Sequence, residues 1–202
     1  MERSHYILMV INALYLVPLI IIFAIKGNWE FLAYIGQVVA LLVLLIATIH
    51  KTHFPIWLLS LLSVWSALHM AGGSVVVGDG VLYAYRIHEF IVLGPNADGF
   101  ILRYDQVIHC FGFFVATFVA YWLLLPQMKH GARIGVLAFI AALAGMGFGA
   151  INEVVEFGAV LAVPDNGVGG YYNTAIDLCA NAVGATLAAV VIVKMKLGLK
   201  ED

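Results

Sequence analysis

Apolar residues occur along the chain in six long runs that are separated by short polar segments. A helix crosses the hydrocarbon core of a bilayer in about 20 residues, and these runs have that length. Backbone polar groups find no water inside lipid, so a spanning segment must satisfy its own hydrogen bonds as a helix. The pattern therefore predicts six transmembrane helices, over residues 6–25, 31–49, 54–71, 104–125, 134–155 and 174–193.

The connection between the third and fourth predicted helices, residues 72–103, is much longer than the others. Within it, the apolar residues 75–77 and 81–85 flank the sequence Gly78-Asp79-Gly80, which is typical of a β-hairpin. A short helix lying in the membrane interface is the alternative interpretation. Either way, Tyr83 and Arg86 suit the headgroup region. We expect an all-α integral membrane protein, one domain over residues 1–202, with this single long loop.

Composition removes the alternative of a soluble domain. Hydrophobic residues make up 63% of the 202 residues and charged residues only 11%. Soluble domains are about 45–50% apolar and about 25% charged. The net charge is −2, with no basic tract that would favour nucleic acid as a partner. Membrane lipids are the partners that this composition predicts.

The distribution of Lys and Arg predicts the orientation in the membrane. With six helices, both termini and the even-numbered loops share one side. Seven cations lie on that side, against three on the other. The seven are Arg3, Lys51, Lys129, Arg133, Lys194, Lys196 and Lys200, and the three are Lys26, Arg86 and Arg103. Because cytoplasmic loops carry the excess of Lys and Arg, we expect a plasma (inner) membrane protein with cytoplasmic termini and an extracytoplasmic long loop.

Polar and ionisable residues gather near the extracytoplasmic ends of four predicted helices. They are His69, Asp105, His109, Glu153, Glu156, Asp177 and Asn181. Three pairs among them are three or four residues apart, a spacing that places both side chains on one side of a helix. A charge inside the bilayer costs about 2.5 kcal/mol or more. We therefore expect these groups to converge on one another in the bundle interior.

The residue types favour a metal centre. His69, His109, Glu153 and Asp177 offer the imidazole and carboxylate ligands that suit zinc, manganese or iron. Glu156 is then the expected general base toward a metal-bound water.

A surrounding polar network is predicted as well. Asp105 is a second candidate catalytic residue, although it also suits a helix cap. Asn181, Tyr83 and Arg86 are expected in the surrounding polar network.

Three functions fit this pattern, besides a hydrogen-bonded network that only holds the helices together. The first is a metal-dependent hydrolase or transferase that acts on a lipid-linked or cell-envelope substrate. The second is a non-catalytic protein that binds a lipid or envelope headgroup. The third is a proton-coupled carrier, in which the carboxylates relay protons. Hydropathy and spacing do not decide between an enzyme and the other two.

Four short motifs resemble the YjdF-like family of uncharacterised bacterial inner-membrane proteins. They are LHMAGG at residues 68–73, YDQVIH at 104–109, NEVVE at 152–156 and NTAIDLCANAVG at 173–184. The order is also similar to that of the VanZ-like family, although Gln106 and Glu156 stand where that family has lysine and glutamine. The resemblance implies a membrane location and a polar cluster, and the VanZ-like similarity suggests a link to the cell envelope.

Overall fold

The computed structural model describes residues 2–91, 100–128, 133–162 and 170–197. Six helices account for most of them: α1 (Arg3–Lys26), α2 (Trp29–Thr52), α3 (Ile56–Ser74), α4 (Tyr104–Leu124), α5 (Ile134–Ala162) and α6 (Tyr171–Met195). All six are long and apolar enough to cross a membrane, which confirms the predicted six-helix fold. Two residues used to predict the orientation, Lys129 and Lys200, lie outside the described residues.

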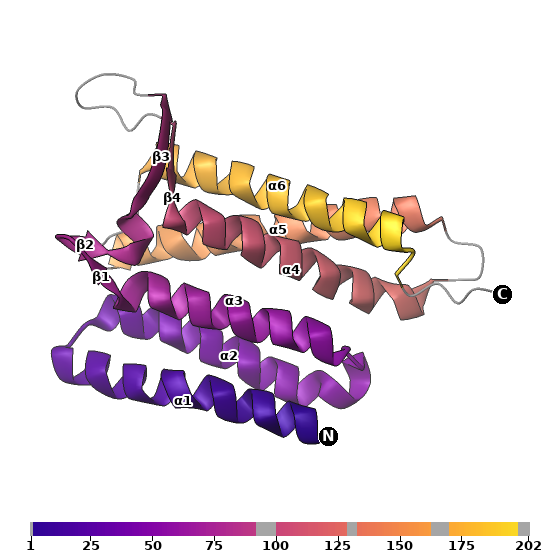
Figure 1. The fold of residues 1–202 in the computed structure, drawn as a ribbon, viewed down its shortest axis with the longest axis horizontal. Coiled ribbons are helices and arrows are strands. Elements are labelled where there is room, and N and C mark those ends of the chain that lie inside the picture. The colour runs from indigo at the N-terminus through magenta and orange to yellow at the C-terminus, as the bar shows by residue number, and fades with distance from the viewer. Residues whose placement is uncertain (1, 92–99, 129–132, 163–169, 198–202) are drawn as a thin grey trace.

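The helices lie side by side in two groups of three, α1–α3 and α4–α6 (Figure 1). One cluster of buried apolar side chains joins α3 to the second group and includes Leu58, Val115, Tyr121 and Ile192. A smaller cluster that includes Leu16, Ile35 and Met70 holds the first group together. The start of α1 and the end of α6 lie at the same end of the molecule, opposite the strands (Figure 1).

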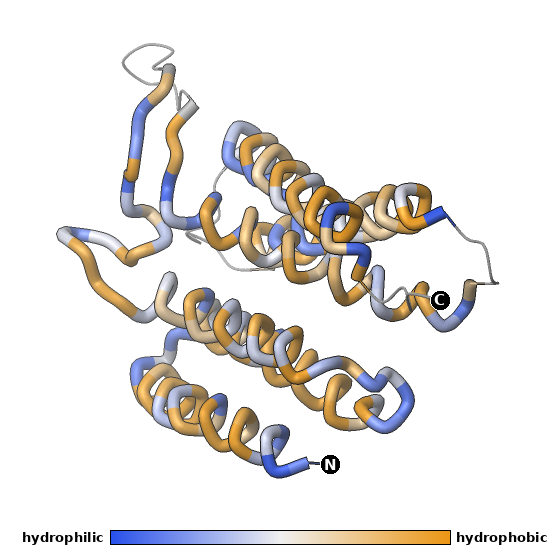
Figure 2. The backbone as a smooth tube through the Cα atoms, turned by 45° about the vertical axis from the view of Figure 1, so that its right-hand side comes forward, coloured by the Kyte–Doolittle hydropathy of each residue, from blue (hydrophilic) through white to orange (hydrophobic). Residues whose placement is uncertain are grey.

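Apolar side chains also cover the outside of the helices. Leu14, Val154 and Leu161 are 71%, 68% and 72% exposed. Figure 2 shows hydrophobic residues along the helices and hydrophilic residues mainly near their ends. An apolar surface of this extent is unfavourable in water and suits contact with lipid tails.

Small residues bring α4, α5 and α6 close together. Gly145 and Gly149 of α5 are buried, and a Cβ atom at Gly149 would lie 2.6 Å from Nδ2 of Asn181. A Cβ atom at Gly184 of α6 would collide with the carbonyl of Cys110 in α4. Glycine at these positions lets the helix backbones approach, as small residues spaced by four do in membrane bundles. This close approach brings the polar side chains of the three helices within contact of one another.

The long loop contains the predicted hairpin. Strands β1 (Val76–Val77) and β2 (Gly80–Val81) are antiparallel, and Gly78 in the turn has a φ of 59°, which favours glycine. The second strand was expected to reach residue 85, but a 3₁₀ turn, η1 (Leu82–Ala84), takes its place. Another 3₁₀ turn, η2 (Leu125–Gln127), follows α4.

A second ribbon in this loop was not predicted. Strand β3 (Arg86–Ile91) pairs antiparallel with β4 (Phe100–Arg103), which leads directly into α4. Residues 92–99, between the two strands, lie outside the described residues. The ribbon therefore joins η1 to the first turn of α4, next to the polar ends of the helices (Figure 1).

Candidate functional site

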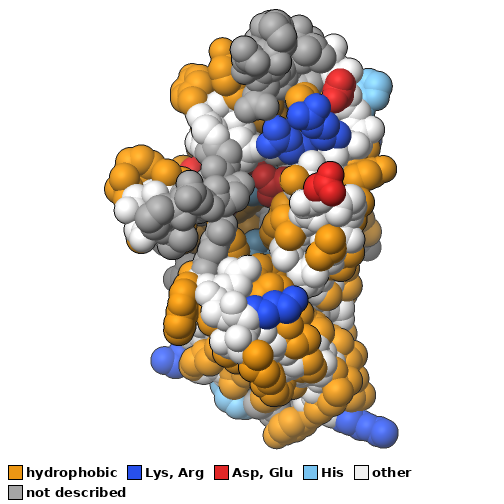
Figure 3. All heavy atoms as spheres, turned by 90° about the vertical axis from the view of Figure 1, so that its left-hand side faces the viewer, with side chains coloured by type: hydrophobic (Ala, Val, Ile, Leu, Met, Phe, Trp, Pro, Cys, Tyr) orange, Lys and Arg blue, Asp and Glu red, His pale blue; other side chains and the backbone are white. Residues whose placement is uncertain are grey.

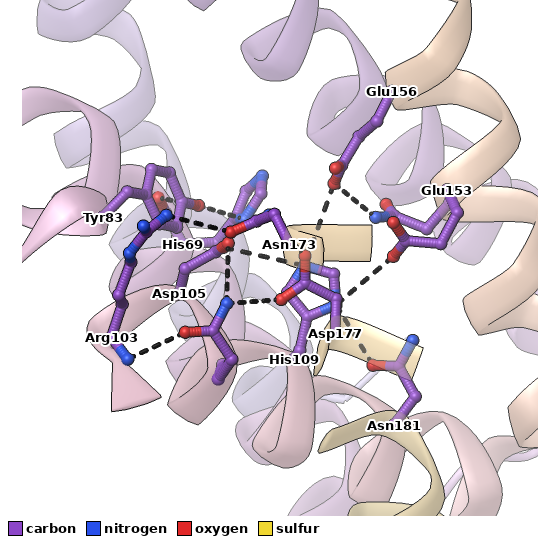
Figure 4. A network of polar contacts seen from close by, with 12 residues as sticks. His69, Tyr83, Arg103, Asp105, His109, Glu153, Glu156, Asn173, Asp177 and Asn181 are labelled. Carbon is purple, nitrogen blue, oxygen red and sulfur yellow. Dashed lines mark hydrogen bonds and ion pairs between the residues drawn. The ribbon is translucent and has the colours of Figure 1, made fainter. Parts of the chain in front are cut away.

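His109 of α4 lies at the centre of a polar cluster that α4, α5 and α6 build together (Figure 4). Its Nε2 atom is 3.6 Å from Oδ1 of Asp105 and 3.8 Å from Oε1 of Glu156. Its Nδ1 atom is 3.6 Å from Oε1 of Glu153 and 3.1 Å from Oδ1 of Asn181. Both ring nitrogens therefore face oxygen atoms, from three different helices.

Glu153 is the least satisfied member of the cluster. Its side chain is 8% exposed, and neither carboxylate oxygen has a hydrogen-bond partner in the described part of the chain. Nδ2 of Asn181 is likewise buried without a partner there. A buried carboxylate that lacks hydrogen bonds is costly unless a cation or a proton compensates its charge. Glu153 therefore requires either a proton on its carboxylate or a cation beside it.

Asp177 is as deeply buried but well satisfied. Nε2 of Gln106 donates to its Oδ1 at 2.6 Å, and Nδ2 of Asn173 donates to its Oδ2 at 2.6 Å. Asn173 in turn accepts from Nη1 of Arg103 at 3.1 Å. These amides orient Asp177, as outer hydrogen bonds orient the ligands of metal sites.

Glu156 has a comparable partner on its own helix. Nδ2 of Asn152, one turn earlier, donates to Oε1 of Glu156 at 2.7 Å. Gln37 of α2 reaches Oδ1 of Asn152 at 3.5 Å, so the polar network extends into the first helix group. Sequence analysis predicted none of four amides as site residues, although three of them occur in the family motifs: Gln37, Gln106, Asn152 and Asn173. Only the spacing of Asn152 and Asn173, four residues before a carboxylate that was identified, gave a signal.

His69 was expected among the metal ligands, but its ring nitrogen contacts Tyr83 instead. The hydroxyl of Tyr83 contacts its Nδ1 and donates to its backbone carbonyl at 2.7 Å, while Trp65 stacks on the ring at 5.2 Å. The hydroxyl has one proton and a carbonyl can only accept, so the Tyr83 oxygen accepts from Nδ1–H. The remaining nitrogen, Nε2, is then the one without a proton.

Gly72 makes room for this arrangement. A Cβ atom there would lie 2.5 Å from the Tyr83 ring, so glycine lets the tyrosine lie against α3.

Among the residues that the structure describes, two sets of three side chains have ligand atoms within 4.8 Å of one another. They are Asp105, His109 and Asp177, and His109, Glu153 and Glu156. The structure thus brings together five of the predicted site residues, with His109 in both sets. His69 belongs to neither set.

Arg86 lies apart from the buried network. It is exposed on β3, where its Nη1 pairs with Oε1 of Glu89 at 3.0 Å.

The cluster is reached from the loop end of the bundle. Asp105 and Glu156 have side chains about one fifth exposed, at 22% and 20%. Figure 3 shows that this end is hollowed, with acidic and histidine side chains recessed inside the hollow. A ligand can therefore approach from the membrane surface without crossing the apolar half of the bundle.

Six apolar helices around a buried cluster of histidine and carboxylates define a multi-pass membrane protein. The chain belongs to the family described as predicted membrane protein (DUF2238), whose match covers residues 5–197. It is also similar to an uncharacterized protein of Thermotoga maritima, at 27% identity over 99 residues. That similarity covers 48% of this chain and 52% of the other, so the chain spans about half the length of the curated relative it matches. No solved structure matches the chain.

Proposed function

We propose that the protein binds a divalent cation through His109, Glu153 and Glu156 and uses it to hydrolyse or transfer a group of a lipid-linked envelope substrate. The observation that carries the proposal is the buried carboxylate of Glu153, whose two oxygens lack hydrogen-bond partners among the described residues. One of them, Oε1, lies 3.6 Å from Nδ1 of His109, a side chain that is itself a common metal ligand.

The charge of the cluster supports a cation. Four carboxylates, those of Asp105, Glu153, Glu156 and Asp177, surround the single imidazole of His109. Even a protonated imidazole would leave the group strongly negative, which a low-dielectric interior disfavours. A bound divalent cation would bring the summed charge of the cluster closer to zero.

Hydrogen bonding favours one of the two ligand sets over the other. Both oxygens of Asp177 already accept short hydrogen bonds from amides, whereas those of Glu153 accept none from the described residues. We therefore assign the cation to the set that contains Glu153, with Asp177 as a neighbouring charge. One histidine and two glutamates suit zinc, manganese or iron.

Such a cation would supply a nucleophile, because it lowers the pKa of a bound water toward about 7. With Glu156 as a ligand, Asp105 is the better candidate for accepting the water's proton. It is partly exposed and lies 3.6 Å from His109.

The position of the site supports a substrate from the membrane surface. The hollow opens at the loop end, which the Lys and Arg distribution predicts to be extracytoplasmic. The motifs shared with the YjdF-like family, and more distantly with the VanZ-like family, agree with a role in the cell envelope.

Elemental analysis of the protein, purified without chelator, tests the proposal. We expect about one zinc, manganese or iron ion per chain, and a clear loss of metal in Glu153→Gln. Glu89→Gln is the matched control, because Glu89 lies on the exposed ribbon and pairs only with Arg86 among the contacts described. Wild-type protein that holds no metal and takes up none of the three ions on reconstitution would refute the proposal. A Glu153→Gln variant with the metal content of Glu89→Gln would do the same.

A further inference from the structure

A groove runs between the three helices of the first group and begins at the end away from the strands. Buried contacts between α1 and α2 gather near the turn at Gly27, where Phe23 packs on Phe31. Toward the other end, the groove between α1, α2 and α3 has a volume of about 350 Å³. Its lining on α1 extends from His5 to Ile20, about 22 Å at 1.5 Å per residue. Because one leaflet of the hydrocarbon core is about 15 Å thick, the groove is long enough for an acyl chain.

The groove is apolar and accessible from the side. Three of its lining residues are polar, namely His5, Asn12 and Ser63. Nδ2 of Asn12 donates to Oγ of Ser63 at 2.8 Å, and Oδ1 of Asn12 accepts from Tyr15 at 2.5 Å, so the protein itself satisfies these groups. Val17, which also lines the groove, is 52% exposed. An occupant would therefore enter from the bilayer and meet apolar surface, which suits a lipid tail rather than water.

A polar cavity adjoins the groove at the ends of the helices. Its volume is about 410 Å³, and it shares His5 and Ile49 with the groove. His50 and His53 line it as well. These residues belong to the start of α1 and the end of α2, opposite the strands (Figure 1). A space that is polar at the membrane surface and apolar along the helices fits an amphiphile.

The cavity offers hydrogen-bond donors to a headgroup. Nδ1 of His5 accepts from the backbone N–H of Glu2 at 2.9 Å, so the neutral ring carries its proton on Nε2. The side chains of His50 and His53 have no hydrogen bond or ion pair with the described residues. Glu2 is the one acidic residue in the lining, and its Oε2 accepts from the Ser4 hydroxyl at 3.5 Å. The imidazole N–H groups are thus available to the oxygens of a phosphate.

The charge around the cavity favours an anionic headgroup. Arg3 follows Glu2 in the chain, Lys51 follows His50, and neither cation has an ion pair among the described residues. Each basic side chain near a membrane surface strengthens the binding of an anionic lipid about fivefold. This end of the bundle is also the one that the Lys and Arg distribution predicts to be cytoplasmic.

We propose that the groove and the cavity together bind one anionic phospholipid of the leaflet opposite the cluster. Its phosphate lies at the histidines of the cavity, and one acyl chain lies in the groove between α1, α2 and α3. The chain fills space that would otherwise lack contacts, and so holds together the helix ends that are furthest from the turn at Gly27. This site lies at the other end of the bundle from the candidate metal site and does not depend on the proposed function.

Binding of dioctanoyl phosphatidylglycerol to the purified full-length protein in detergent tests the site. Dioctanoyl phosphatidylcholine has the same chains without a net charge, and glycerophosphoglycerol has the same headgroup without chains. We expect the anionic lipid to bind at least about fivefold more tightly than either. Equal affinity of the phosphatidylcholine would overturn the anionic headgroup, and equal affinity of glycerophosphoglycerol would overturn the lipid as the ligand.

A tryptophan in the groove tests where the acyl chain lies. Ala13 lines the groove, so Ala13→Trp should weaken the binding of phosphatidylglycerol about tenfold or more, because the new side chain takes the space of the acyl chain. Ala24→Trp is the control, because Ala24 is an exposed alanine of the same helix outside the groove lining. If Ala13→Trp does not fold, Val17→Phe fills the groove from another lining position. Affinities equal to that of Ala24→Trp would contradict binding in the groove.

The contacts with the headgroup are tested by Lys51→Gln combined with His53→Asn. Asparagine suits the left-handed backbone at His53, where φ is 48°. We expect phosphatidylglycerol to bind about fivefold or more weakly and phosphatidylcholine nearly as before, so that the preference for the anionic lipid is lost. Lys26→Gln with His88→Asn is the control, since it changes a lysine and a histidine at the opposite end of the bundle. An equal loss in the control, or an unchanged preference in the test variant, would rule out recognition by the cavity.

Discussion

Nε2 of Gln106 donates a 2.6 Å hydrogen bond to Oδ1 of Asp177 and so ties α4 to α6 where both side chains are buried. Gln106→Leu would leave that oxygen without its donor at nearly unchanged side-chain size. We expect a loss of about 1–3 kcal/mol in the free energy of unfolding, measured by denaturant titration in detergent. Gln37→Leu is the control, because its contact with Asn152 is a longer 3.5 Å and only partly buried. Equal losses in the two variants would contradict the importance of the α4–α6 bond.

Alanine substitutions at two glycines of α5 should affect the stability of the protein differently. At Gly149 the new Cβ would lie 2.6 Å from Nδ2 of Asn181, whose Oδ1 contacts His109. We expect Gly149→Ala to lower the melting temperature and also to reduce metal binding. At Gly147 no described atom beyond the adjacent turns of α5 itself lies within 4 Å of the new Cβ, so Gly147→Ala should be neutral or stabilising by up to about 1 kcal/mol. A melting temperature unchanged by Gly149→Ala would show that α5 and α6 are less closely packed than described.

The stability of the protein should fall at high pH because of Tyr83. Burial, followed by the charge of Asp105, raises the pKa of Tyr83 well above its usual value. In the unfolded chain this hydroxyl ionises near pH 10, while in the folded protein it stays protonated. The stabilisation is thus complete below about pH 10 and is lost as pH rises through the folded-state pKa. Unfolding followed between pH 8 and 11 should show a smaller high-pH loss in Tyr83→Phe than in the wild type, and parallel curves would exclude Tyr83 as the cause.

Tyr83 should also determine which nitrogen of His69 carries the proton. Because the hydroxyl donates to the backbone carbonyl of His69, the ring should be protonated at Nδ1 when neutral. Nitrogen NMR of protein labelled at histidine should show this tautomer, and Tyr83→Phe should reduce its population. Tyr85→Phe, at an exposed tyrosine of the same loop, is the control. A wild-type His69 protonated at Nε2 would contradict the hydrogen-bond assignment.

The helices were predictable because apolar run length alone determines them. The depth of the cluster was predictable as well, since buried charge is costly wherever it occurs in a spanning helix. The direction in which His69 points was not, because depth along α3 does not determine which neighbour it faces. That neighbour, Tyr83, comes from a 3₁₀ turn in place of the expected strand.

The buried amides and the β3–β4 ribbon were harder to predict from the sequence, for different reasons. Gln106 and Asn173 lie in the first turns of α4 and α6, where polar residues are usually solvated. The four-residue spacing of Asn173 from Asp177 was the one hint in the sequence, and nothing marked Gln106 as a partner of Asp177. The pairing of Arg86 with Arg103 joins strands that are separated by residues 92–99. The hydrophobic pattern within each strand does not determine the register in which two strands pair across a gap of this length.

The first residue of α1 and the last residue of α6 lie at the end of the bundle opposite the ribbon. A reporter domain fused near either of these helix ends would therefore occupy the aqueous compartment that the cluster does not face. In sealed vesicles with a single orientation, a membrane-impermeant chelator added outside should reach either the reporter or the cluster, but not both. The side of the membrane to which the cluster opens can thus be determined relative to the side that holds the fused reporter.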